Sequence, residues 1–161
     1  MKHKQEKIIL GLDPGFGRTG FAVLGGTKNE PRLISFGCLE TSAKLLHPQR
    51  LEQLAKQLKK LLTRYQPQLI SIEKIFFAAN SKTALQVGEA RGVLLVTIAV
   101  KHLPIVEFTP PQVKLAVTGD GRADKKQIQK MLQLVFKLTT PIKQDDAADA
   151  VAIAFCALTY L

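Results

Sequence analysis

Short apolar runs alternate with clusters of turn-forming residues along the first quarter of the chain. Runs of this length, bounded by glycine, proline and asparagine, are typical of β-strands. They predict an antiparallel meander of three strands, over Ile8–Leu12, Phe21–Leu24 and Leu33–Leu39. The first strand leads into the sequence DPGFG at residues 13–17, whose proline and glycines predict a tight turn.

The spacing of the apolar residues lengthens after this meander. From Leu51 to Tyr65 they recur at intervals of three and four, and the basic residues lie away from that stripe, so the pattern predicts an amphipathic helix that ends near Pro67. The next segments predict a strand, a long helix that is apolar on more than one face and another strand, over Leu69–Phe76, Ser81–Lys101 and Pro104–Phe108. Three further helices are predicted over Val113–Val117, Ile128–Phe136 and Ala147–Leu161.

The order of these elements is βββαβαβ followed by helices. It predicts an α/β fold, a five-stranded mixed sheet flanked by helices, with a right-handed crossover after the meander. No repeat, low-complexity tract or flexible linker divides the 161 residues, and this length is usual for one domain. We therefore expect residues 1–161 to form a single domain.

The net charge indicates a class of partner. The chain has 23 lysines and arginines against 13 aspartates and glutamates, which gives a formal net charge of +10. Such an excess favours binding to polyanions, nucleic acid above all, although a ribosomal protein or a merely solubilising surface would have the same composition.

Cysteine usage and hydropathy argue against other classes. Cys38 and Cys156 are isolated and no secretory signal is evident, so we expect two packing thiols in a cytoplasmic protein, with neither a disulfide framework nor a zinc cluster. The longest apolar stretch, Gly92–Val100, is about half of the roughly 20 residues needed to cross a bilayer. It predicts a buried helix segment and no membrane role.

Carboxylates in apolar surroundings are the candidates for chemistry, because burying one costs several kcal/mol unless a cation or hydrogen-bond donors compensate it. Asp13 ends an apolar strand, where it could also form an Asx-turn. Glu73 interrupts an apolar strand, where it could also lie at an exposed edge or pair with Lys74. Asp146 and Asp149 share one face of an otherwise apolar helix, where they could also interact with the helix macrodipole.

Acidic oxygens without histidine or cysteine suit hard cations, Mg²⁺ or its substitute Mn²⁺. A pair of such ions, roughly 3.5 to 4 Å apart, supports phosphodiester hydrolysis, while a basic surface binds the substrate phosphates. We therefore expect two metal ions per site. Asp145 is expected to have the structural role of N-cap of the last helix.

Four groups of residues resemble those of a known family: ILGLDPG at residues 9–15 with Thr19 and Gly20, IEKIF at 72–76, GEARG at 88–92 and DAADA at 146–150. In their order and spacing, over nearly the whole chain, they resemble the Holliday-junction resolvases of the RuvC family. The resemblance implies a ribonuclease-H-like fold and a homodimer that nicks opposite strands of a four-way DNA junction. It also implies Mg²⁺ dependence, ligatable 5′-phosphate ends and the RuvA–RuvB branch-migration complex as a partner.

The resemblance also assigns roles to individual residues. By position, the family's four metal-binding carboxylates correspond to Asp13, Glu73, Asp146 and Asp149, although some relatives have histidine at the position of Asp146. The family's DNA contacts correspond to Phe76, Lys114 and Lys125. Without the resemblance, a phenylalanine at the position of Phe76 is more often a core residue, with Phe77 as the exposed member in its place, and lysines such as Lys114 and Lys125 are more often simply solvated.

The long helix Ser81–Lys101 offers a physical reason for dimerisation, because one apolar face can pack on the sheet and the other on a second copy. Such a dimer fits the two-fold symmetry of a four-way junction.

Three other functions fit parts of the sequence. ATPases of the actin and sugar-kinase group also have an aspartate before a glycine-rich turn, but their two-lobed chains are much longer. A different ribonuclease-H-like nuclease would act on RNA hybrids or RNA precursors. A junction-binding protein without catalysis is the third alternative, and the presence of all four carboxylates argues against it.

Overall fold

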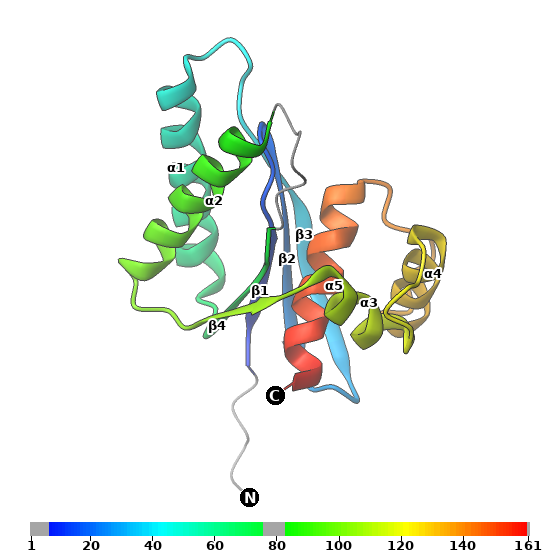
Figure 1. Cartoon of the computed structure of the whole chain (residues 1–161). Helices are drawn as coiled ribbons and strands as arrows, with labels where there is room; N and C mark the ends of the chain where they lie inside the picture. Colours follow the sequence, from blue (N-terminus) through cyan, green and yellow to red (C-terminus); the bar gives the residue numbers. More distant parts are fainter. Residues whose placement is uncertain (1–6, 76–82, 161) are drawn as a thin grey trace, which may run out of the picture.

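The computed structural model describes residues 7–75 and 83–160, which form a five-stranded sheet with helices on both faces (Figure 1). The order of the strands across the sheet is β3-β2-β1-β4-β5. The strands are β1 (Ile9–Asp13), β2 (Arg18–Gly26), β3 (Pro31–Glu40), β4 (Leu69–Glu73) and β5 (Ile105–Phe108). The helices are α1 (His47–Tyr65), α2 (Ala84–Ala99), α3 (Pro110–Thr118), α4 (Lys125–Val135) and α5 (Asp145–Tyr160).

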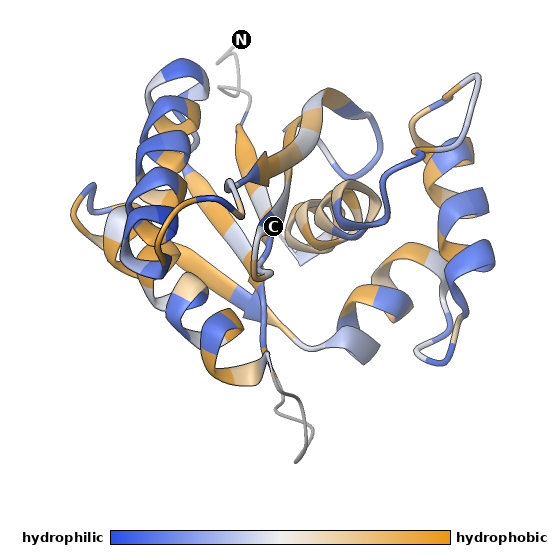
Figure 2. Ribbon diagram, turned by 90° about the horizontal axis from the view of Figure 1, so that it is seen from above, coloured by the Kyte–Doolittle hydropathy of each residue, from blue (hydrophilic) through white to orange (hydrophobic). Residues whose placement is uncertain are grey.

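The sheet is mixed, as the sequence predicts. Strands β1, β2 and β3 form an antiparallel meander, whereas β4 pairs in parallel with both β1 and β5. Helices α1 and α2 cover one face, and α5 covers the other with α3 and α4 outside it (Figure 1). Seen from above, hydrophobic positions occupy the strands and hydrophilic positions gather on the outer sides of the helices (Figure 2).

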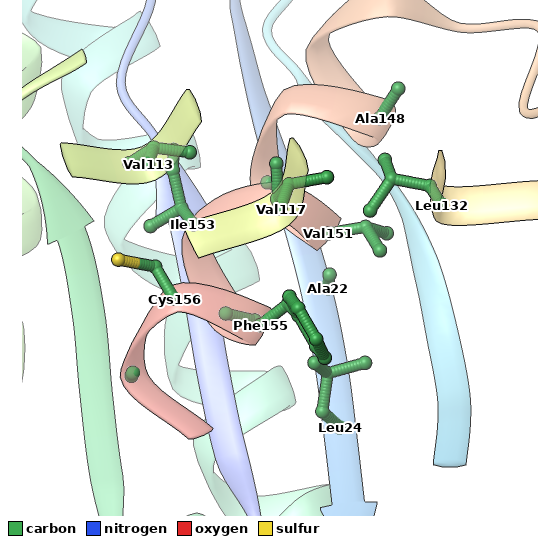
Figure 3. Packing of buried hydrophobic residues seen from close by; sticks show 14 of the residues in the cluster. Ala22, Leu24, Val113, Val117, Leu132, Ala148, Val151, Ile153, Phe155 and Cys156 are labelled. Atoms are coloured by element: carbon green, nitrogen blue, oxygen red, sulfur yellow. The ribbon is translucent and has the colours of Figure 1, made fainter. Parts of the chain in front are cut away.

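The alternation of side chains along the strands divides the core into two clusters. On one face, Ile9 and Leu24 contact α5 and α3, and Figure 3 shows Val113 and Val117 of α3 packed beside Ile153 of α5. A second set of strand residues packs against α1 and α2 on the opposite face: Leu10, Leu12, Val23, Leu39, Ile70 and Ile72. Successive residues of β1 therefore belong to different clusters, as the two-residue period of a strand requires.

Glycine and alanine allow α5 to pack unusually close to the sheet. A β carbon on Gly11 would lie 2.6 Å from the β carbon of Ala154, so only glycine fits at this position of β1. The helix has alanine at many of its buried positions, including Ala147 and Ala150. The close packing brings the start of α5 to the end of β1.

Helix boundaries differ from the predicted ones where polar residues begin a helix. Helix α1 begins at His47, four residues before the apolar stripe, with Pro48 in its first turn. Helix α3 begins at Pro110, where the Thr109 side chain accepts a hydrogen bond from the Gln112 amide. These starts depend on capping and proline, which the hydrophobic period does not report.

The expected capping role of Asp145 is wrong. Helix α5 begins at Asp145, and the Gln144 carbonyl accepts the first helical hydrogen bond, from the Ala148 amide. Gln144 is therefore the N-cap, and Asp145 is the first residue of the helix.

Two further expectations concern the cysteines and the membrane. Cys38 and Cys156 are free thiols, and Cys156 is buried in the cluster around α5. Within the described ranges, no helix combines the length and the hydrophobicity needed to span a bilayer.

Candidate active site

Asp13 and Glu73 lie side by side at one edge of the sheet. Leu12 of β1 is beside Ile72 of β4 in the parallel pair, so the residues that follow them end the two strands together. Ser71 donates a hydrogen bond to the Ile153 carbonyl of α5 (2.8 Å), which shows that this side of β4 faces α5. Because side chains two apart on a strand share a face, Glu73 also points to the α5 side.

Helix α5 brings Asp146 and Asp149 to the same edge. Gly20, the cross-strand partner of Asp13, lies directly against the main-chain carbonyl of Asp146. Asp149 lies one turn further along α5 than Asp146 and is half-buried. The structure thus brings together all four carboxylates that the sequence singles out, although they are spread over the whole length of the chain.

Burial, together with repulsion between the carboxylates, raises the pKa of three of them. Burial raises the pKa of Asp13 from 3.8 to about 8, and repulsion from Glu73, Asp149 and Asp146 adds to the effect. Burial also raises the pKa of Glu73, with a further contribution from Asp149. The pKa of Asp149 is raised by burial and by neighbouring aspartates, against the opposing effect of Lys125.

Two basic residues lie at the rim of this acidic cluster. The Arg18 guanidinium lies 3.2 Å from Glu40 and 3.7 Å from Asp146, so it connects β3 to the start of α5. The Lys125 amine lies 3.5 Å from the Asp145 carboxylate and lowers the pKa of both Asp13 and Asp149. Each side chain remains at least half exposed and can therefore reach an anionic ligand.

The donor set fits a hard divalent cation. Within the described ranges, no hydrogen bond or ion pair compensates the partly buried carboxylates of Asp13, Glu73 or Asp149, and their mutual repulsion is what a bound cation would relieve. In the part of the chain that the structure describes, no group of three aspartate, glutamate, histidine or cysteine side chains is already close enough to hold a metal ion. The carboxylates would therefore have to close on an ion by side-chain rotation.

The predicted DNA contacts fall in different places. Lys125 is the first residue of α4, beside the acidic cluster, and its amine is exposed. Lys114 lies on α3 and is partly buried. Phe76 and Phe77 lie outside the described residues.

Sequence reasoning missed Arg18 and overlooked the proximity of Lys125 to the carboxylates. The signal for Arg18 was available, because it is the first residue of the strand that follows the turn after Asp13. Nothing local in the sequence relates Lys125 to Asp145, which is 20 positions away, so that ion pair depends on how α4 and α5 pack.

Comparison with known proteins agrees with this fold and this site. A family model described as "Crossover junction endodeoxyribonuclease RuvC" matches residues 9–157. A protein of that name from Petrotoga mobilis is 48% identical over 149 residues, which cover 92% of this chain and 91% of that protein. A structure of Thermus thermophilus RuvC has 28% identity and a TM-score of 0.85 over 95% of both chains. A second, of T. thermophilus RuvC in complex with Holliday junction substrate, has 28% identity and a TM-score of 0.90 over 96% of this chain and 94% of that one. These matches confirm the expected ribonuclease-H-like fold.

Proposed function

The chain belongs to the RuvC family of crossover junction endodeoxyribonucleases, and we propose that it resolves four-way DNA junctions with Asp13, Glu73, Asp146 and Asp149 as its metal-binding carboxylates. The observation that supports this assignment is the convergence of the four acids where β1, β4 and α5 meet. Residues 1–161 then act as one nuclease domain in DNA recombination and repair.

The metal in this proposal is Mg²⁺, two ions per site, with Mn²⁺ as a substitute. When bound, the pair supplies activation of the attacking water and stabilisation of the leaving 3′ oxygen. Asp13 is the central ligand, because its charge interacts with those of the other three carboxylates. Arg18 orients Asp146 from the rim of the site.

The basic side chains beside the acids hold the DNA. Lys125 binds a phosphate next to the scissile bond, because its exposed amine lies close to the carboxylate cluster. Lys114 binds the backbone further out on α3. Phe76 stacks on an unpaired base near the crossover, a role that carries over from the family alone.

The nuclease works as a homodimer through α2. Leu94 and Ile98 of this helix are buried against the sheet, whereas Leu85, Val96 and Val100 are 75%, 59% and 68% exposed. A second copy can cover this apolar face by two-fold symmetry, and the resulting pair of sites matches the two equivalent strands of a junction. Partnership with RuvA–RuvB follows from family membership alone, and stimulation of cleavage by that complex would test it.

Cleavage of an end-labelled synthetic four-way junction tests the proposal, with a linear duplex and an RNA–DNA hybrid as controls, in Mg²⁺ and in EDTA. Symmetric nicks in opposite strands of the junction alone, only with metal and sealable by ligase, are expected. Binding without cutting would favour an inactive junction-binding protein. Preferential cutting of the hybrid would favour a different ribonuclease-H-like nuclease.

A further inference from the structure

The turn between β1 and β2 carries one large side chain, Phe16, which is held from one side by α1. The Arg50 guanidinium carbon lies 4.2 Å from the centre of the Phe16 ring, and the His47 ring centre lies 5.7 Å from it. The negative face of an aromatic ring attracts a cation placed over it, and the attraction is stronger where water is excluded. Phe16 lies between Asp13 and Arg18 in the sequence, so a contact that fixes its ring also restrains the stretch of chain that joins these two site residues.

A second layer of hydrogen bonds fixes the residues that hold Phe16. The Arg50 Nε–H donates to Thr41 Oγ1 (3.1 Å), and the Thr41 amide donates to the Gly17 carbonyl (2.9 Å). His47 Nε2 lies 2.5 Å from Glu89 Oε2, which links α1 to α2. The network therefore joins the turn to two helices that are distant from it in the sequence.

Gly17 shows how closely this network fits the turn. Its φ of +81° lies in the left-handed region, and a β carbon there would lie 2.7 Å from Arg50 Nη2. The small hollow beneath the turn is lined in part by Leu39, Leu54 and Ala90, which come from three different elements. The turn therefore packs where α1, α2 and β3 meet.

We propose that Phe16, Arg50, His47 and Glu89 form a clamp that fixes the turn at residues 14–17 and thereby positions Asp13 and Arg18 for metal and phosphate. This inference rests on the proposed function. Buried like charges at the end of β1 tend to separate when no cation is present, and a fixed turn resists that separation. Glu89 is the first polar residue of the GEARG motif, to which the nuclease chemistry assigns no direct role.

The clamp predicts a specific effect of Glu89→Ala, measured first without metal. The Thr41 amide, which donates to the turn, should exchange with solvent about tenfold faster than in the wild type in EDTA. The Mg²⁺ concentration for half-maximal junction cleavage should rise about tenfold, a magnitude typical of residues that position metal ligands, with junction affinity in Ca²⁺ unchanged. Glu89→Gln should restore both properties, because its amide oxygen still accepts a hydrogen bond from His47.

Glu52→Ala is the matched control, because Glu52 is an exposed acid that pairs with Lys56 within α1 (2.7 Å) and has no contact with the turn. It should leave Thr41 exchange and the Mg²⁺ requirement at wild-type values. Phe16→Leu, which removes the ring from beneath Arg50, should reproduce the Glu89→Ala phenotype.

Unchanged exchange and unchanged Mg²⁺ requirement in Glu89→Ala would overturn the clamp, and so would equal effects of Glu89→Ala and Glu52→Ala. A wild-type protein that does not cut junctions would contradict the proposed function, while the exchange rate of Thr41 would still test the clamp.

Discussion

Gly20 of β2 lies directly against the main-chain carbonyl of Asp146 at the start of α5, with no room for a β carbon. Gly20→Ala should therefore push the start of α5, and with it Asp146, away from the sheet. We expect a loss of about 1–3 kcal/mol in the free energy of unfolding, as for other overpacked positions, together with slower junction cleavage. Denaturant unfolding and single-turnover cleavage measure the two effects. Gly121→Ala is the stability control, because the nearest atom to its added carbon is at 3.4 Å; equal stability of the two variants would contradict the close packing.

Asp13→Asn should abolish cutting and preserve binding. The substitution removes the central carboxylate but keeps the size of the side chain, so we expect cleavage to fall by at least about a hundredfold while the junction Kd stays near the wild-type value. A gel-shift assay in Ca²⁺ and a cleavage assay in Mg²⁺ separate the two properties. Cleavage at the wild-type rate would show that the site is elsewhere.

Stability of the metal-free protein should depend on pH through Asp13. Because its pKa rises from 3.8 to about 8, the folded chain binds more protons than the unfolded chain between these values, and stability falls as pH rises through this window. Asp13→Asn removes the effect. In EDTA the variant should match the wild type in Tm near about pH 4 and exceed it increasingly up to about pH 8.

Adding Mg²⁺ at the alkaline end of that window should raise the Tm of the wild type, because the cation neutralises the carboxylate charges that repel one another. It should leave the Tm of Asp13→Asn nearly unchanged, because this variant lacks the central carboxylate. A constant difference in Tm between the two proteins across the whole range would show that Asp13 is not buried among like charges.

Lys125→Ala should weaken junction binding and reduce its dependence on salt. Loss of one phosphate contact lowers the slope of log K against log salt by about 1, and this change should be the same for every junction sequence. Fluorescence anisotropy across a salt series measures the slope. Lys59→Ala, on the solvent side of α1, is the control and should leave the slope unchanged. An equal reduction of the slope by both variants would show that Lys125 contacts the DNA no more closely than any other surface lysine.

Val96→Lys should convert the proposed dimer to a monomer. Val96 is 59% exposed on α2, and a lysine there would bury a charge in the proposed interface. Sedimentation at micromolar concentration should show a wild-type dimer and a monomeric variant. Leu134→Lys, at a residue 62% exposed on α4, should stay dimeric. A wild-type protein that is monomeric with and without junction DNA would refute paired nicking.

Much of the fold could be predicted because hydrophobic period is a local property. The unbroken apolar run in Ile8–Leu12 reflects a strand that is buried on both faces, and the three-and-four spacing from Leu51 to Tyr65 reflects a helix that buries one face; β1 and α1 are found there. The ends were less accurate. Helix α1 begins earlier, at His47, because proline and polar residues set its first turn.

The four carboxylates were identifiable for a related reason. A charged residue in or directly after an apolar segment is conspicuous in sequence: Asp13 follows one such segment and Glu73 interrupts another, although β4 itself ends at Glu73. Their metal-binding role remains a prediction, as do the roles of Lys114 and Phe76. The Asp145 cap was wrong because one residue of shift at a helix start changes which group accepts the first hydrogen bond.

The sequence by itself determined the order of the elements and the acids available for chemistry, since each depends on neighbours a few residues apart, and that order in turn predicted the mixed sheet. Only the tertiary structure decided which groups meet: Gly20 with Asp146, Lys125 with Asp145, and His47 with Glu89 across 42 positions. The first pair depends on how closely α5 packs against the sheet, the second on how α4 lies beside α5, and the third on how α1 lies beside α2. All three arrangements are settled by burying the two hydrophobic clusters at once, a condition on the whole chain that no local pattern contains.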